Sequence, residues 1–189
     1  MILTGIRSDF FRISQEGIAM NQNSIIEQLK YDPDAGALTY RDVRYLLIRP
    51  ETIVGFQKAI EKHSRKGARE ALFQGGYQGG YLSAKKYKAV QNLSDNETLT
   101  FMMTMGAEIG WGNFQLMEYD LENRKMQIRV TNSAFARAYG RSTEGVCHLI
   151  RGVLSGLATV LFSSNSTASE IQCLARGDEC CEFHIATED

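Results

Sequence analysis

The stretch Glu170-Ile-Gln-Cys-Leu-Ala-Arg-Gly-Asp-Glu-Cys-Cys-Glu-Phe183 decides the fold of the carboxyl-terminal part of the chain. Ser166 to Leu174 and Cys180 to Ile185 have strand-like composition, and the Arg-Gly-Asp between them is typical of a turn. We therefore predict a final β-hairpin. Its arms lie close together, so Cys173 on one arm and Cys181 on the other can bind the same ion.

A metal site is the chemical interpretation of the cysteines. The four cysteines of the chain all lie in its last quarter, and Glu170 precedes Cys173 by three positions. Thiolates are preferred zinc ligands, and a carboxylate can complete a tetrahedral set. Four protein ligands leave no open position, so such a site would be structural and would hold Cys147, at the start of a long helix, against the hairpin.

Two other interpretations of the cysteines stay open on the residues alone. Free cysteines are commonly buried as small hydrophobic residues. A disulfide is the second alternative, although reducing compartments disfavour it. The spacing does not settle the choice, because the sequence contains no Cys-x-x-Cys pair.

The helix that precedes the hairpin is the most periodic part of the sequence. It is expected from about Gly145 to Phe162, with one apolar stripe and with Gly152 and Gly156 beside that stripe. Further upstream, the segment LFQGGYQGGYLSA at 72–84 is also predicted to be helical. Each of its four glycines costs about 1 kcal/mol relative to alanine in a helix. We therefore expect either a close approach of another backbone or a kink.

Between these two helical segments the sequence predicts a helix, a strand pair and a short helix. Ser94 or Asp95 would cap the first helix, and Asn132 or Ser133 the last. The expected ranges are a helix from Leu99 to Ile109, strands Phe114–Tyr119 and Lys125–Val130, and a helical segment Phe135–Tyr139.

The amino-terminal part is expected to be an arm followed by a helix pair. The expected elements are an irregular strand or arm Ile2–Ile13, a helical turn Ser24–Leu29, strands Ala37–Arg41 and Val43–Ile48, and a helix opened by Pro50. We predict an α+β fold in which an antiparallel sheet packs against helices. Residues 1–90 would form the arm and helix pair, used in sensing or dimerisation, and residues 91–189 the zinc-containing, ligand-binding domain.

Composition excludes several classes of function. Of the 189 residues, 43% are hydrophobic and 23% charged, which is typical of a globular domain. The net charge of −1 and the scattered basic residues argue against direct nucleic-acid binding. No apolar run reaches the roughly 18 residues of a membrane span. The amino terminus lacks the features of a signal peptide, so we expect a cytoplasmic protein.

The motifs above resemble a known family. The order of an acid, a Cys, a Gly and a Cys-x-Phe in Glu170–Phe183 resembles the end of the 4-vinyl reductase domain, and Val130–Gly156 is similar to the preceding part of that domain. Arg44–Gly80 resembles the helix-pair segment in the sensory modules of aromatic-responsive activators of the XylR/DmpR type. Together the resemblance covers roughly Ala37 to Ile185.

The resemblance implies a homodimeric α+β module with a closed pocket for an aromatic or hydrocarbon ligand. It also implies a zinc ion, because the three Cys and one Glu that bind zinc in phenol-sensing members match residues of this chain in order and spacing. These residues are Cys147, Glu170, Cys173 and Cys181. Cys180 falls outside the pattern.

The chain also departs from the activators. They continue into an ATPase domain and a DNA-binding domain, whereas no Walker A sequence occurs here. We therefore expect a stand-alone sensor, a subunit that acts through a partner protein, or an excised part of a longer protein. His63, His148 and His184 do not fall on the strands where phenol sensors use histidine, which argues against a phenol ligand.

Methionine and aromatic residues are dense from position 101 to 139, which favours an adaptable apolar pocket. Each of them could equally belong to an ordinary core. The predicted ligand-binding residues are Phe101, Met105, Trp111, Phe114, Met126, Phe135 and Tyr139.

The sequence thus favours a sensor of an apolar small molecule, with signalling through a dimer or a partner and a role in transcription regulation. Two alternatives stay open: a tetrapyrrole-related reductase or accessory protein, and a structural adaptor. No Ser/His/Asp set, His-Glu-x-x-His or Gly-rich phosphate loop is present, so no catalytic residue is predicted.

Overall fold

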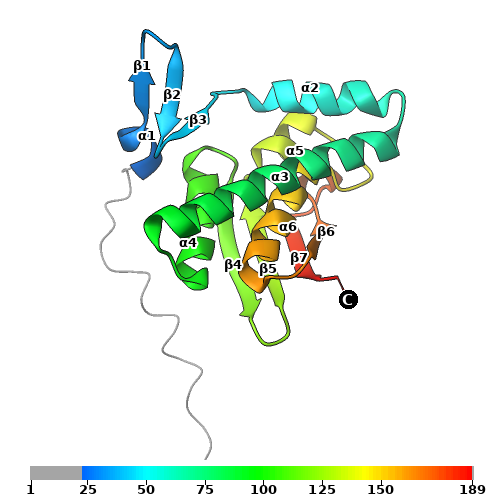
Figure 1. The fold of residues 1–189 in the computed structure, drawn as a ribbon. Helices are drawn as coiled ribbons and strands as arrows, with labels where there is room; N and C mark the ends of the chain where they lie inside the picture. Colours follow the sequence, from blue (N-terminus) through cyan, green and yellow to red (C-terminus); the bar gives the residue numbers. More distant parts are fainter. Residues whose placement is uncertain (1–22, 189) are drawn as a thin grey trace, which may run out of the picture.

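The computed structural model describes residues 23–188 and has a mixed helix and antiparallel sheet architecture, as predicted (Figure 1). The predicted arm Ile2–Ile13 lies outside these residues. The elements are α1 (Ser24–Gln28), β1 (Lys30–Asp32), β2 (Ala37–Tyr40), β3 (Val43–Tyr45), α2 (Pro50–Glu61), α3 (Arg65–Gln91), α4 (Asp95–Glu108), β4 (Asn113–Asp120), β5 (Lys125–Thr131), α5 (Ala134–Tyr139), α6 (His148–Phe162), β6 (Ser166–Gln172), the 3-10 helix η1 (Leu174–Arg176) and β7 (Cys181–Thr187).

The main sheet is antiparallel, with strand order β4-β5-β7-β6. Burial alternates along β5, so every second residue faces the core, as expected for a strand with one covered face. The register places buried residues of β5 beside buried residues of β7. The pairs are Met126 with Ile185, Ile128 with Phe183, and Val130 with Cys181.

The helix α6 lies between this sheet and α3 (Figure 1). Gly76 and Gly80 on α3 face Gly152 and Gly156 on α6, and a Cβ atom at any of these glycines would collide with the backbone of the other helix. The predicted close approach is therefore confirmed. The alternative of a kink is wrong, because α3 is one continuous helix over 27 residues.

A smaller sheet, β1-β2-β3, packs with α1 against the carboxyl-terminal part of α3 and against α4. Its buried cluster contains Ile25, Tyr40, Tyr87 and Met105. The hydroxyl groups of Tyr45 and Tyr87 lie 2.6 Å apart and are hydrogen-bonded. This cluster fixes the small sheet to one end of α3.

Helix boundaries follow their capping residues. Ser94 caps α4 in a capping box with Glu97, and Ser133 caps α5, both within the predicted alternatives. The helix α6 begins at His148 rather than at Gly145, because Gly145 and Cys147 belong to a loop that contacts Glu170. The main core includes Ala84 of α3 together with residues of the carboxyl-terminal part, and the domain division near residue 90 stays a prediction.

Candidate metal centre

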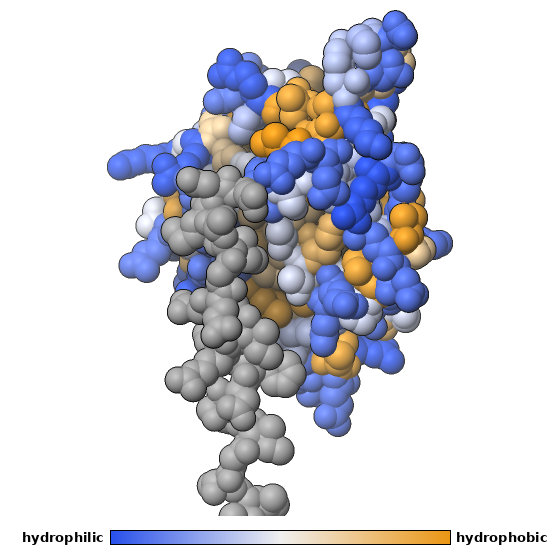
Figure 2. Space-filling model, turned by 90° about the vertical axis from the view of Figure 1, so that its left-hand side faces the viewer, coloured by the Kyte–Doolittle hydropathy of each residue, from blue (hydrophilic) through white to orange (hydrophobic). Residues whose placement is uncertain are grey.

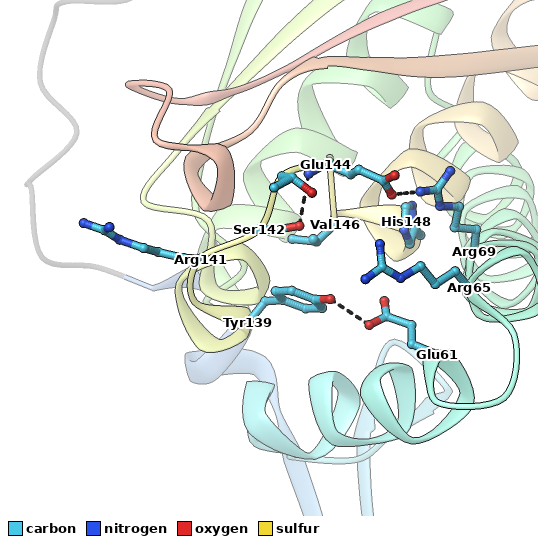
Figure 3. A pocket seen from close by; sticks show the side chains of 11 residues that line it. Glu61, Arg65, Arg69, Tyr139, Arg141, Ser142, Glu144, Val146 and His148 are labelled. Carbon is cyan, nitrogen blue, oxygen red and sulfur yellow. Dashed lines mark hydrogen bonds and ion pairs between the residues drawn. The ribbon is translucent and has the colours of Figure 1, made fainter.

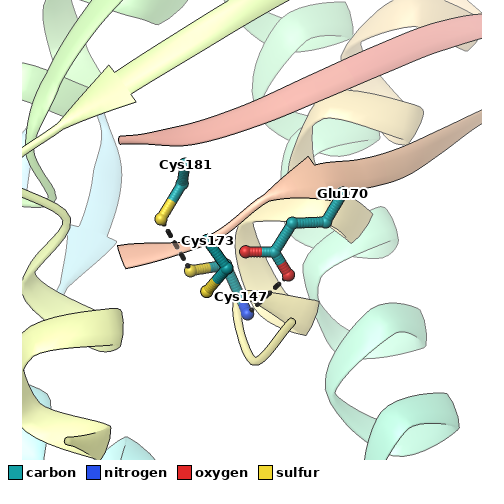
Figure 4. A group of neighbouring side chains, drawn as sticks. All are labelled: Cys147, Glu170, Cys173 and Cys181. Carbon is teal, nitrogen blue, oxygen red and sulfur yellow. Dashed lines mark hydrogen bonds between the residues drawn. The ribbon is translucent and has the colours of Figure 1, made fainter. Parts of the chain in front are cut away.

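Three cysteines and one glutamate meet where α6 begins and the final hairpin turns (Figure 4). Cys147 immediately precedes α6, Glu170 lies on β6, Cys173 follows β6, and Cys181 begins β7. Their potential ligand atoms all lie within 4.8 Å of one another. The structure therefore brings together the four residues that the sequence singled out.

Backbone geometry around the hairpin loop orients these side chains. The amide of Leu174 donates to the Sγ of Cys181 over 3.4 Å, and the amide of Cys173 donates to the Oδ2 of Asp178 over 2.7 Å. Arg176 in turn donates to the same Asp178 carboxylate over 2.7 Å. The loop thus presents two sulfur atoms toward the start of α6, with its own polar groups satisfied.

Burial sets the electrostatics of the cluster. Cys147 is 1% exposed, while Cys173 and Cys181 are fully buried. Burial, reinforced by the charge of Cys173, raises the pKa of Glu170 to about 8. The neighbouring thiols of Cys147 and Cys181 hold the pKa of Cys173 well below its usual range. Negative charge is therefore concentrated in a dry site, which is the electrostatic setting in which a cation is bound.

The Glu170 carboxylate has one oxygen engaged and one free among the described residues. Its Oε2 accepts a hydrogen bond of 3.1 Å from the amide of Cys147, whereas its Oε1 is buried without a hydrogen-bond partner. A Cβ at Gly145 would lie 2.5 Å from Oε2, so glycine there leaves room for the carboxylate. A buried, unpartnered carboxylate oxygen beside three thiols is a donor set that could hold a metal ion.

The remaining cysteine and two of the histidines lie apart from the cluster. Cys180 donates to the Oε1 of Gln172 over 3.2 Å. His184 is exposed, as predicted, and lies 3.7 Å from the carboxylate of Glu182. His148 is buried but lines a different cavity. None of these three is in the four-residue cluster.

The seven predicted ligand-binding residues are distributed over two buried clusters. Trp111 and Phe135 touch edge to face, with ring centroids 5.1 Å apart, and lie in the main core with Phe114 and Met126. Phe101 and Met105 belong to the second cluster, under the small sheet. Tyr139 lies at the edge of the main core, beside a polar cavity. Their role in ligand binding stays a prediction.

That polar cavity, of about 430 Å³, lies next to the metal cluster and was not foreseen from the sequence (Figure 3). Arg65 and Arg69 come from the first turns of α3, Tyr139 from α5, and Val146 and His148 from the start of α6. Only tertiary packing joins residues so distant in the chain. The spacing of the two arginines, four apart on a helix, was the one local signal available.

Within residues 23–188, no helix combines the length and the hydropathy needed to cross a bilayer.

Comparison with known proteins places the fold. Residues 126–187 match the model of the 4-vinyl reductase domain. The phenol-responsive sensory domain of the transcription activator PoxR, solved with phenol, is similar with a TM-score of 0.76 and 16% identity over 86% of each chain. No curated protein matches the chain.

Two further solved structures share the fold at lower similarity. A vinyl-4-reductase family protein from Methanocaldococcus jannaschii has a TM-score of 0.53 and 18% identity, over 79% of this chain and 86% of that one. A trafficking protein particle complex subunit 3 from Naegleria fowleri, covalently bound to palmitic acid, has a TM-score of 0.51 and 12% identity, over 74% of this chain and 95% of that one.

The family match covers β5 to β7 and therefore includes all four residues of the candidate metal centre. Residues 126–187 form a 4-vinyl reductase domain, as the resemblance implied, and the chain as a whole has the fold of the sensory module of an aromatic-responsive activator.

Proposed function

We propose that this chain is a sensor of an apolar small molecule, stabilised by a structural zinc ion and signalling in the cytoplasm through a homodimer or a partner protein, with an output in transcription regulation. The fold similarity to a phenol-responsive sensory domain over 86% of both chains carries this proposal. It extends beyond the 4-vinyl reductase domain to the helix pair, so the similarity covers the sensory architecture and not only its last third.

The donor set favours zinc as the metal. Three thiols and one carboxylate suit zinc, whereas calcium and magnesium select oxygen ligands. In a tetrahedral site with Zn–S bonds of about 2.3 Å, two sulfur atoms lie about 3.8 Å apart. The Sγ atoms of Cys147 and Cys181 are 3.5 Å apart, so a small expansion of the cluster accommodates the ion. Four protein ligands make the role structural.

We place the apolar ligand between α4, the main sheet and α6. Half-buried Met102 and Met103 face this region, and methionine adapts readily to irregular ligands. Tyr119 stacks on Phe162 with ring centroids 6.1 Å apart, and its hydroxyl is buried with no hydrogen-bond partner among the described residues. A ligand with one polar group would satisfy that hydroxyl.

The dimer would use the apolar surface between β3 and α2. Leu46, Leu47 and Ile48 are exposed there, with Leu47 86% exposed, and Phe56 on α2 is 61% exposed. Figure 2 shows hydrophobic surface gathered near the top of the molecule, beside the small sheet. Exposed apolar residues clustered in this way are typical of an interface.

Native mass spectrometry of the purified chain, followed by denaturation and extraction, tests the three parts together. We expect a dimer with one zinc ion per chain and an apolar molecule released on unfolding. Leu47→Asp should yield a monomer that keeps its zinc, which separates the interface from the metal site. A chain that purifies without metal or apolar molecule, and takes up neither when supplied, contradicts the proposal.

A structural adaptor is the second candidate, favoured by the likeness to the trafficking complex subunit. An adaptor would retain zinc and would assemble with other proteins, but its folding and assembly would not respond to small aromatic or hydrocarbon compounds. A thermal-shift screen with such compounds discriminates the two: a saturable rise in melting temperature supports the sensor, and its absence across the screen supports the adaptor.

A further inference from the structure

The cavity beside the metal cluster has the composition of an anion site. It holds about 430 Å³, room for a small organic molecule, and three arginines and two glutamates line it, which leaves one net positive charge. Hydroxyl groups of Tyr139 and Ser142 also line it. Arginine side chains facing hydroxyl groups form the chemistry that recognises carboxylates and phosphates.

The two glutamates of the cavity are already engaged. Glu144 forms an ion pair with Arg69. Glu61 accepts a hydrogen bond of 2.7 Å from the hydroxyl of Tyr139 and one of 2.9 Å from Gln57. Arg65, by contrast, has no carboxylate within ion-pair distance among residues 23–188. In Figure 3 its guanidinium points into the space between Tyr139 and His148, while Arg141 points away from the cavity.

His148 supplies an independent observation. Its side chain lines the cavity and is 5% exposed, yet its Nδ1 has no hydrogen-bond partner among the described residues. A buried imidazole nitrogen without a partner is costly unless a ligand or water satisfies it. The imidazole of His148 and the guanidinium of Arg65 face the same space (Figure 3).

We propose that this cavity binds a small oxyanion, a carboxylate or a phosphate group, held chiefly by Arg65 with His148 and Ser142 completing the contacts. The site is separate from the apolar region proposed between α4, the sheet and α6. It adjoins Gly145 and Val146, which precede the metal ligand Cys147. An anion bound there would order the loop that presents this cysteine.

Side-chain and backbone NMR of the zinc-loaded full chain tests the proposal directly. Inorganic phosphate and benzoate are titrated separately at constant ionic strength, and the Arg Nε–H signals and the amides of residues 142–148 are followed. We expect saturable shifts in both groups of signals. Tighter binding of phosphate indicates a phosphate-bearing ligand, and tighter binding of benzoate indicates an aromatic carboxylate.

Arg65→Gln should weaken binding by about tenfold or more, because it removes a charge-assisted, bidentate donor. Arg65 is exposed, so this variant should fold and keep its zinc. Lys66→Gln is the matched control: it removes the same charge one residue away on α3, and Lys66 does not line the cavity. Shifts that never saturate, or an equal loss in both variants, would overturn the proposal.

Discussion

The helix α6 is held at two places by opposite means. At its amino-terminal end, Cys147 joins a cluster of specific donor groups from the hairpin. In its middle, Gly152 and Gly156 let the backbone of α3 approach through the absence of side chains. The first attachment depends on chemistry and can be removed by a chelator or by acid. The second depends on empty space and responds only to added atoms.

Loss of the metal should have the largest effect on this comparison. Cys173→Ser removes a ligand from a closed site, so the variant should purify without zinc. If zinc is present at a thousandfold above its Kd, its binding contributes about 4 kcal/mol to the free energy of unfolding. Urea denaturation with parallel metal analysis measures both quantities.

Cys180→Ser is the control for that experiment, because Cys180 lies outside the cluster. This variant should keep its zinc and nearly all of its stability. If Cys180→Ser lost the metal while Cys173→Ser retained it, the assignment of ligands on the hairpin would be wrong.

An added methyl group in the helix contact should have the next largest effect. In Gly152→Ala, the new Cβ would collide with the carbonyl of Phe73 and lie 2.8 Å from the amide nitrogen of Tyr77. Both are backbone atoms that cannot rotate away, so the helices must separate. We expect a loss of about 2–3 kcal/mol in the free energy of unfolding, with unchanged zinc content. A stability equal to that of the unmodified chain would contradict the close contact.

The charge state of the metal-free protein predicts a proton count. Contact with Cys173 and Cys181, together with burial, raises the pKa of Cys147 well above its usual value. A hydrogen bond from Cys147 lowers the pKa of Cys181, but the contact with Cys173 and burial together raise it to about 12. With the pKa of Glu170 at about 8, the metal-free site at pH 7 holds protons on these three groups.

Zinc binding at pH 7 should therefore release about three protons, and affinity should fall as the pH is lowered, because protons and metal compete for the same atoms. Calorimetric titrations in buffers of different ionisation enthalpy count the protons. Glu170→Gln should reduce the release to about two and should bind zinc more weakly. An unchanged proton count in this variant would show that Glu170 is not a ligand.

The smallest effect is expected on the outer face of α3. Nothing lies within 4 Å of a Cβ built at Gly79, in contrast to its neighbour Gly80, where Val153 blocks the space. Gly79→Ala should therefore raise the free energy of unfolding by about 0.5–1 kcal/mol through helix propensity alone. A decrease, seen by the same urea method used for Gly152→Ala, would indicate that a second chain packs on this face.

Local patterns carried most of the prediction of the fold. The period of 3.6 residues identified α6, Ser94 and Ser133 marked helix starts, and the Arg-Gly-Asp turn marked the hairpin. The boundary of α6 was misplaced by three residues, because Gly145 is used by the Glu170 carboxylate and not by the helix. A competing tertiary contact of this kind leaves no trace in local periodicity.

The metal cluster was foreseen more completely than the ligand-binding residues. Cys173 and Cys181 lie on one hairpin, whose short connection brings them together whatever the rest of the fold does. Phe101, Phe135 and Tyr139 come from different elements, and their apolar character is equally suited to any core. Which of them meet depends on helix packing, and the structure separates Phe101 from Phe135 into different clusters.

The sequence by itself determined the class of elements, the need for close backbone approach at the glycines, and the identity of four residues able to bind a metal. These follow from local periodicity, from the cost of glycine in a helix, and from donor chemistry. Only the tertiary structure decided that α3 and α6 are the partners in that approach and that Arg65 and His148 share a cavity. Contacts between residues about eighty positions apart depend on the packing of whole helices, and no local pattern encodes that packing.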